Sequence, residues 1–138
     1  MQIHIFDTDH LSLYGHGNPS LITRLEERQI QLTTTAINVE EQLRGRLAQI
    51  SEIKDGENQS TAYQYLTDTM LMLSEFDILP YDATAREIYQ SLKAHRIRVG
   101  TQDLRIASIV IANDGILLTR NRKDFEKIPK LIIEDWTL

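Results

Sequence analysis

The sequence contains no cysteine, only three prolines and six glycines, and no long apolar run. Without cysteine, disulfides and thiolate zinc sites are excluded, as is usual for proteins of a reducing cytoplasm. No window approaches the roughly 18 uninterrupted apolar residues that a membrane span needs. Residues 1–7 also lack the cationic start and long apolar stretch of a secretory signal. We therefore expect a cytoplasmic protein with no membrane association.

Length and composition predict one domain over residues 1–138. The hydrophobic fraction of 41% and the charged fraction of 25% are ordinary for a globular protein. A chain of 138 residues leaves no room for two complete cores. The polar stretch 51–60 is expected to be a loop between helices rather than a domain boundary.

The charge is unevenly distributed along the chain. The net charge is −5, yet residues 93–130 carry nine basic residues against four acids, a balance of +5. Residues 1–92 carry six basic residues against fourteen acids, a balance of −8. Because phosphate binding depends on the local field, the basic segment permits an RNA partner. The count alone equally fits a solvated, charged surface.

Short apolar runs alternate with amphipathic segments, which predicts an α/β fold with a parallel sheet and helices on both faces. One helix is expected to begin at Asn38, as an N-cap, with Glu41 completing a capping box. Helices are expected at 19–28, from 38 onward, and at 61–74, 85–92 and 102–113. Strands are expected at 3–6, 31–37, 76–79, 116–118 and 131–133.

Polar side chains stand where these strands end. Ligands of such folds bind beyond the carboxyl ends of the strands, so acids at that edge matter most. Each acid alone is equally explained as a helix cap or a turn residue. Together they would repel one another unless a cation neutralised them. The residues at that edge are Asp7, Glu41, Asp103, Asn121 and Asp124.

An oxygen-rich set of this kind suits a hard cation, chiefly Mg²⁺ or Mn²⁺. Such a cation lowers the pKa of bound water and stabilises charge on a phosphate under attack. The four histidines, His4, His10, His16 and His95, offer no pair at helical spacing and are interpreted as ordinary strand, loop or surface residues. His10 is a minor exception, because it is close to Asp7 in sequence.

The acids lie in four segments of recognisable pattern. Residues 5–12 read Ile-Phe-Asp-Thr-Asp-His-Leu-Ser, an Asp-Thr-Asp directly after an apolar strand. In residues 39–45 an acid, Glu41, stands four residues before a glycine. Residues 102–107 open an alanine-containing helix with Asp103. In residues 117–129 Asp124 is followed by an aromatic residue and a proline.

In this order and spacing, the four segments resemble the motifs of PIN-domain ribonucleases of the VapC type. The ending Ile133-Glu134-Asp135-Trp136 is similar to the family's as well. The resemblance covers the whole chain. Asn121 departs from it, because many PIN domains have an acid there, and Lys130 replaces a common glycine.

The resemblance implies a three-layer α/β/α PIN fold with a short, mostly parallel sheet of about five strands. It implies a toxin that cleaves tRNA or rRNA with Mg²⁺ or Mn²⁺, bound and blocked by a VapB-like antitoxin. A homodimer formed by helices of the N-terminal half is also implied. Asp7, Glu41 and Asp103 would hold the metal, and Asp124 and Asn121 would complete the catalytic set.

RNA would be bound by the basic segment, residues 93–130. Two other functions are alternatives to the nuclease. A phosphatase resembling haloacid dehalogenases would use Asp7 as nucleophile and Asp9 as general acid. A catalytically silent PIN module would bind RNA or a protein without cleavage. The expected RNA-binding residues are Arg96, Arg98, Arg105, Arg120, Arg122 and Lys123.

Overall fold

The structure is a computed structural model that describes residues 2–53, 56 and 58–138. Five short strands and seven helices follow one another in those ranges. The strands are β1 (His4–Phe6), β2 (Thr33–Thr35), β3 (Asp77–Leu79), β4 (Ile116–Leu118) and β5 (Ile132–Glu134). The helices are α1 (Thr8–Gly15), α2 (Pro19–Arg28), α3 (Ala36–Glu52), α4 (Gln59–Leu73), α5 (Ala83–Ala94), α6 (Thr101–Ala112) and α7 (Arg122–Phe125).

The five strands form one sheet in the order β3-β2-β1-β4-β5, and every pairing is parallel. β1 lies at the centre, where Phe6 is in register with Thr34 of β2 and Leu118 of β4. The predicted parallel sheet of about five strands is therefore confirmed. Because all strands run the same way, their carboxyl ends meet at one edge.

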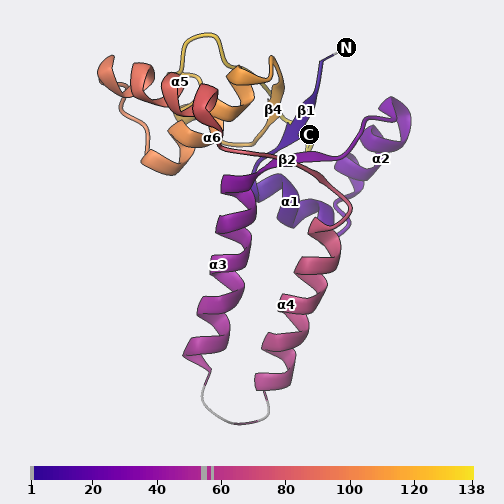
Figure 1. Cartoon of the computed structure of the whole chain (residues 1–138). Coiled ribbons are helices and arrows are strands. Elements are labelled where there is room, and N and C mark those ends of the chain that lie inside the picture. The colour runs from indigo at the N-terminus through magenta and orange to yellow at the C-terminus, as the bar shows by residue number, and fades with distance from the viewer. Residues whose placement is uncertain (1, 54–55, 57) are drawn as a thin grey trace.

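Alternation along the central strands builds a hydrophobic core on each face of the sheet. Ile5 and Leu117 point into the core covered by α5 and α6, which includes Leu104 and Ile109. Phe6 of β1 points, with Ile116 and Leu118 of β4, into the core covered by α1 and α2. Figure 1 shows the two helical layers on either side of the sheet. The predicted three-layer arrangement is confirmed.

Helices α3 and α4 run side by side and project away from the sheet as a long hairpin (Figure 1). The predicted loop 51–60 is shorter than expected, because α3 continues to Glu52 and α4 begins at Gln59. Residues 54, 55 and 57 of that loop lie outside the described residues. Among the described residues, each helix is too short or too polar to span a membrane.

One predicted helix start was wrong. Thr35 caps α3, and its side-chain oxygen accepts a hydrogen bond from the backbone N–H of Asn38 at 3.2 Å. Asn38 is thus already inside the helix, and Glu41 lies beyond the first turn instead of completing a capping box. Two short helices, α1 and α7, were not predicted from the sequence, although their caps, Asp7 and Asn121, are site candidates.

Gly115 provides a test of the packing around β1, and Gly45 in α3 provides its control. A Cβ at Gly115 would stand 2.6 Å from Cδ1 of the buried Ile5 and 3.1 Å from the carbonyl oxygen of Ile3. We expect Gly115→Ala to lower the free energy of unfolding by ~1–3 kcal/mol through overpacking. A Cβ at Gly45, inside α3, meets nothing within 4 Å. Gly45→Ala should therefore raise it by ~0.5–1 kcal/mol through helix propensity.

Urea unfolding of both variants and the wild type measures the difference. The account of the β1–β4 packing fails if Gly115→Ala is as stable as the wild type while Gly45→Ala shows the expected gain.

Candidate active site

Asp7 follows β1 directly and is 6% exposed. Its backbone N–H donates to the carbonyl of Leu118 at 3.1 Å, which ties it to the end of β4. Its Oδ1 accepts a hydrogen bond from the backbone N–H of His10 at 2.7 Å, so Asp7 is the N-cap of α1. The cap uses one carboxylate oxygen. Oδ2 accepts no hydrogen bond from the part of the chain that the structure describes, which leaves it for another ligand.

Glu41 reaches the same edge from α3, one turn beyond Asn38. Its Oε1 accepts a hydrogen bond from the hydroxyl of Thr8 at 2.5 Å. Asn38 lies behind this contact and is fully buried, with Nδ2 donating to the carbonyl of Phe6 at 3.0 Å. Glu40, by contrast, is exposed and pairs with Arg44 at 2.6 Å. The choice of Glu41 over Glu40 agrees with this geometry.

Asp103 lies in the first turn of α6, as predicted. Burial, followed by the negative charges of Glu41, Asp124 and Asp7, raises the pKa of its carboxyl from 3.8 to about 6. Glu41 lies on α3, Asp124 on α7, and Asp7 directly after β1. Four carboxylates of the predicted set therefore share one electrostatic environment.

Asn121 and Asp124 complete the set beyond β4. Asn121 is the N-cap of α7, and its Nδ2 donates to Oδ2 of Asp124 at 3.2 Å. Lys127 stands 3.8 Å from the other oxygen of Asp124. Asn121 thus contacts Asp124 and orients its carboxylate. The structure brings all five predicted site residues to the carboxyl edge of the sheet.

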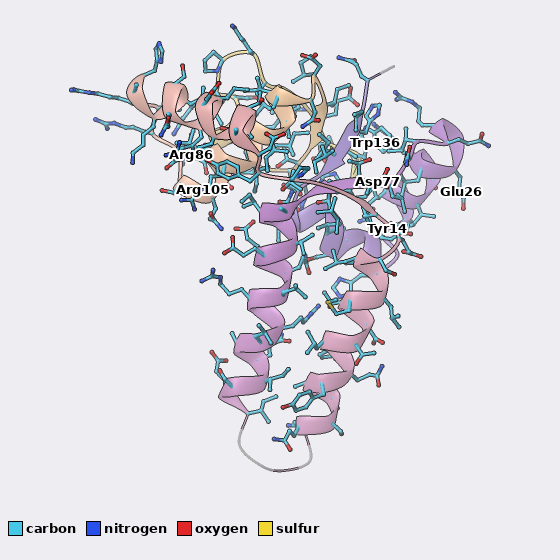
Figure 2. The ribbon with its side chains drawn as sticks, in the orientation of Figure 1. Tyr14, Glu26, Asp77, Arg86, Arg105 and Trp136 are labelled. Atoms are coloured by element: carbon cyan, nitrogen blue, oxygen red, sulfur yellow. The ribbon has the colours of Figure 1, made fainter. Side chains whose placement is uncertain are left out.

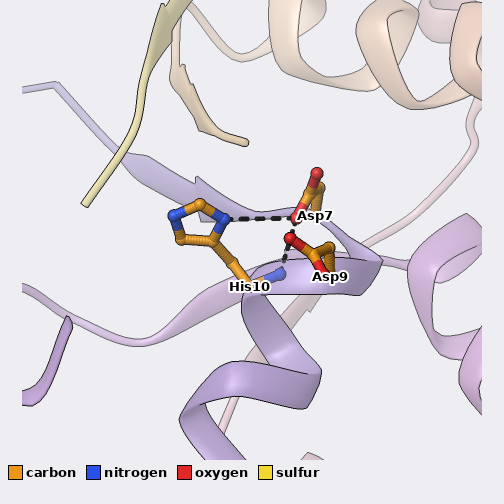
Figure 3. A group of neighbouring side chains, drawn as sticks. All are labelled: Asp7, Asp9 and His10. Carbon is orange, nitrogen blue, oxygen red and sulfur yellow. Dashed lines mark hydrogen bonds and ion pairs between the residues drawn. The ribbon is translucent and has the colours of Figure 1, made fainter. Parts of the chain in front are cut away.

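Asp9 and His10 also lie beside Asp7. One ligand atom from each of the three residues lies within 4.8 Å of the others (Figure 3). Among the described residues, no other set of three acidic or histidine side chains lies as close together. Asp9 already has a partner, because Arg120 binds both of its oxygens, at 2.5 and 2.8 Å. The side chain of His10 is fully buried. Asp7 is therefore the member of this group most available to a cation.

Oxygen donors dominate the edge, as a hard divalent cation requires. Asp7, Glu41 and Asp103 each present a carboxylate to it, and the raised pKa of Asp103 reflects its burial and, after that, the negative charges of Glu41, Asp124 and Asp7. This donor set fits Mg²⁺ or Mn²⁺.

The six predicted RNA-binding residues do not all present a free charge. Arg120 is bound to Asp9, and Arg122 lies 3.8 Å from Glu126. The guanidinium of Arg105 lies 5.5 Å from the ring centroid of Tyr89 and donates to Gln102 at 2.8 Å. Figure 2 places Arg105 on the α5–α6 side, across the sheet from α2. Arg96, Arg98 and Lys123 are exposed.

Sequence reasoning missed the residues that hold the acids in place. The Thr8 hydroxyl donates to Glu41, Oδ1 of Asn38 lies 3.0 Å from that hydroxyl, and His10 lies against Asp7. The sequence contained a signal for two of them, because Thr8 lies inside the Asp-Thr-Asp motif and His10 directly follows it. Arg120 was predicted to bind RNA, but in this structure it binds Asp9.

The PIN domain family matches residues 5–131. Two curated relatives cover part of the chain. Ribonuclease VapC2 of Rickettsia felis is 36% identical over 70 residues, which are 48% of this chain and 52% of the relative. Ribonuclease VapC of Rickettsia bellii is 34% identical over 86 residues, which are 59% of this chain and 62% of the relative. The chain thus spans about half to three fifths of these relatives.

Solved structures match over nearly the whole length. VapBC2 of Rickettsia felis, bound to a promoter DNA fragment, gives a TM-score of 0.78 at 26% identity and covers 98% of this chain and 99% of that one. DNA-bound VapBC of Salmonella typhimurium gives 0.79 at 23% identity, covering 99% of both chains, which shows the fold. The VapC-type resemblance is confirmed, and this chain belongs to the PIN-domain family.

Proposed function

We propose that this protein is a metal-dependent endoribonuclease, the toxin of a type II toxin–antitoxin pair, and that residues 1–138 act as a single PIN domain in the cytoplasm. One observation carries the proposal. Asp7, Glu41, Asp103 and Asp124 converge at the carboxyl edge of the sheet of a PIN-family chain. The relatives named ribonucleases support the reaction type.

In the proposed site, Asp7, Glu41 and Asp103 hold Mg²⁺ or Mn²⁺. When bound, such a cation supplies an activated water and stabilises negative charge on the attacked phosphate. Asp7 contributes Oδ2, because Oδ1 is committed to the cap of α1. Thr8 orients Glu41 by its hydroxyl, and Asn121 orients Asp124 by its amide. Asp7, Glu41 and Asp124 are therefore each restrained by a hydrogen bond.

The proposed substrate is tRNA or rRNA. Support comes from the exposed basic side chains beside the acidic edge, which provide charge for the phosphate backbone. Arg120 contributes differently, since its charge is compensated by Asp9 in the absence of a ligand.

A VapB-like antitoxin and a second copy of the chain are the proposed protein partners. The solved VapBC complexes support the antitoxin. Large apolar side chains are exposed on the α3–α4 hairpin, an arrangement suited to protein contacts. They are Leu47, Tyr63, Tyr65, Met70 and Leu71, with exposed fractions of 49% to 64%.

The phosphatase alternative loses its general acid in this structure. Asp9 would have to protonate a leaving group, yet both its oxygens are held by Arg120. The silent module also fits poorly. A binding protein gains nothing from burying Asp103 beside three other carboxylates, an arrangement that raises the pKa of Asp103 to about 6.

The decisive variants are Asp7→Asn and Asp103→Asn, because asparagine keeps the shape and removes the charge. Wild-type protein should cleave RNA with Mg²⁺ or Mn²⁺ and lose activity in EDTA. Each variant should cleave at least ~10² more slowly. Glu26→Gln serves as the control, because Glu26 is exposed on α2, away from the site (Figure 2). Full cleavage by either aspartate variant contradicts the proposed roles, and cleavage that survives chelation contradicts metal dependence.

Stability without metal gives the same variants a second test. The pKa of Asp103 is raised in the folded protein, so the folded state loses stability as the pH rises from about 4 to about 6. Asp103→Asn removes that loss. Thermal unfolding at pH 7.5 in EDTA should show this variant at least as stable as the wild type, with the difference vanishing below pH 4. A variant that unfolds at pH 7.5 would make Asp103 a structural residue.

Neutralising the basic segment tests the RNA surface. Alanine at all six predicted positions should weaken RNA binding at least ~10-fold at low salt and flatten its salt dependence, because fewer counterions are released. Arg24→Ala, on α2 across the sheet, should change neither quantity. An unchanged affinity and salt slope in the sixfold variant would show that the segment is a solvated surface. The six are Arg96, Arg98, Arg105, Arg120, Arg122 and Lys123.

A further inference from the structure

His10 has an exposed fraction of 0%. It lies in the first turn of α1, three residues after Asp7, and its ring packs edge-on against Phe6 with centroids 6.4 Å apart. Figure 3 shows one ring nitrogen directed at Asp7. The other nitrogen faces the C-terminal segment at Trp136. The imidazole thus stands between the candidate site and the end of the chain.

The contact with Trp136 determines where the ring proton lies. The backbone N–H of Trp136 donates to Nε2 of His10 at 3.3 Å. A backbone amide can only donate, so Nε2 carries a lone pair, and the proton of the neutral ring is on Nδ1. Asp135 stands 3.8 Å from Nε2, beyond hydrogen-bond distance. Its Oδ1 already accepts from the backbone N–H and the hydroxyl of Thr137.

The Nδ1 donor therefore faces Asp7. It lies 3.4 Å from Oδ1 and has no hydrogen-bond partner among the described residues. This distance is slightly longer than an ordinary N–H···O bond, so a small rotation of the ring closes it. A buried N–H donor that has no other acceptor among the described residues is stabilised by that contact. Oδ1 is then held by two donors of the same residue, the backbone N–H and Nδ1–H of His10.

We propose that His10 is a positioning residue for Asp7. Its Nδ1–H, fixed by the Trp136 backbone, holds Oδ1 so that Oδ2 stays directed at the cation. The inference rests on the proposed function, because it assigns Asp7 to a metal. It also links the C-terminal segment to the site, since Trp136 selects the tautomer across 126 residues of sequence. Partners behind a metal ligand of this kind restrict its orientation and tune its affinity.

The tautomer is measured first, on the wild-type protein without metal. Long-range ¹H–¹⁵N correlation spectra distinguish a protonated from an unprotonated ring nitrogen. We expect His10 at pH 7.5 to carry its proton on Nδ1, with Nε2 unprotonated. A proton on Nε2, in the neutral ring or in an imidazolium, would overturn the proposal whatever the protein's activity.

Two substitutions then separate the two nitrogens. The amide nitrogen of His10→Asn can occupy the place of Nδ1 and donate to Asp7. The amide of His10→Gln reaches the place of Nε2 and can accept from Trp136, but it offers Asp7 no donor. We expect Mn²⁺ affinity, measured by electron paramagnetic resonance, to fall ~10–100-fold in His10→Gln and to stay within ~3-fold of wild type in His10→Asn. The RNA cleavage rate at subsaturating Mn²⁺ should follow the same order.

Thermal unfolding in EDTA shows whether both variants are folded. Equal losses of Mn²⁺ affinity in two folded variants, or none in His10→Gln, would refute the positioning role. If neither variant folds, the tautomer of the wild type decides. A wild-type protein that binds no Mn²⁺ and cleaves no RNA would instead refute the proposed function, so the two failures are distinguishable.

Discussion

Like charges gathered at a partly buried sheet edge destabilise a folded protein unless something offsets them, and most of this structure can be understood from that constraint. A parallel sheet brings the carboxyl ends of β1 and β4 together, and the first turn of α6 adds Asp103. Mutual repulsion alone would move these carboxylates apart. The chain instead holds Glu41 with Thr8 and Asp124 with Asn121. The fold keeps its carboxylates together at a cost in stability, which is reasonable where a cation offsets the repulsion.

The rigidity of the surrounding structure makes this arrangement possible. Helix α6 is buried along most of its length, so Asp103 cannot move away without disturbing the core that contains Leu104 and Ile109. β1 is buried on both faces, which fixes Asp7 at its end. The helical hairpin of α3 and α4 differs, since it projects from the sheet with several apolar side chains exposed. The molecule thus combines a fixed acidic edge with a protruding surface suited to protein partners.

The sequence predicted the five strands and the acidic edge well because both depend on short local patterns. An apolar run followed by an acid places Asp7 without knowledge of the rest of the fold. The start of α3 was mispredicted, because Thr35 and Asn38 are both good N-caps and only the length of β2 decides between them. The contacts of Arg120 with Asp9 and of His10 with Trp136 join residues 111 and 126 positions apart. No local pattern carries such information, so these contacts required the structure.

If the acids at the sheet edge form a cation site, the ionisation of Asp103 must respond to the bound cation. The ¹³C chemical shift of its carboxyl carbon can be followed against pH in EDTA and then with saturating Mg²⁺. We expect a midpoint near pH 6 without metal, since burial and the charges of Glu41, Asp124 and Asp7 raise the pKa to about 6. With Mg²⁺ the midpoint should fall below the ordinary value of 3.8, because the cation favours the carboxylate. The same midpoint with and without Mg²⁺ would show that these acids do not form a cation site.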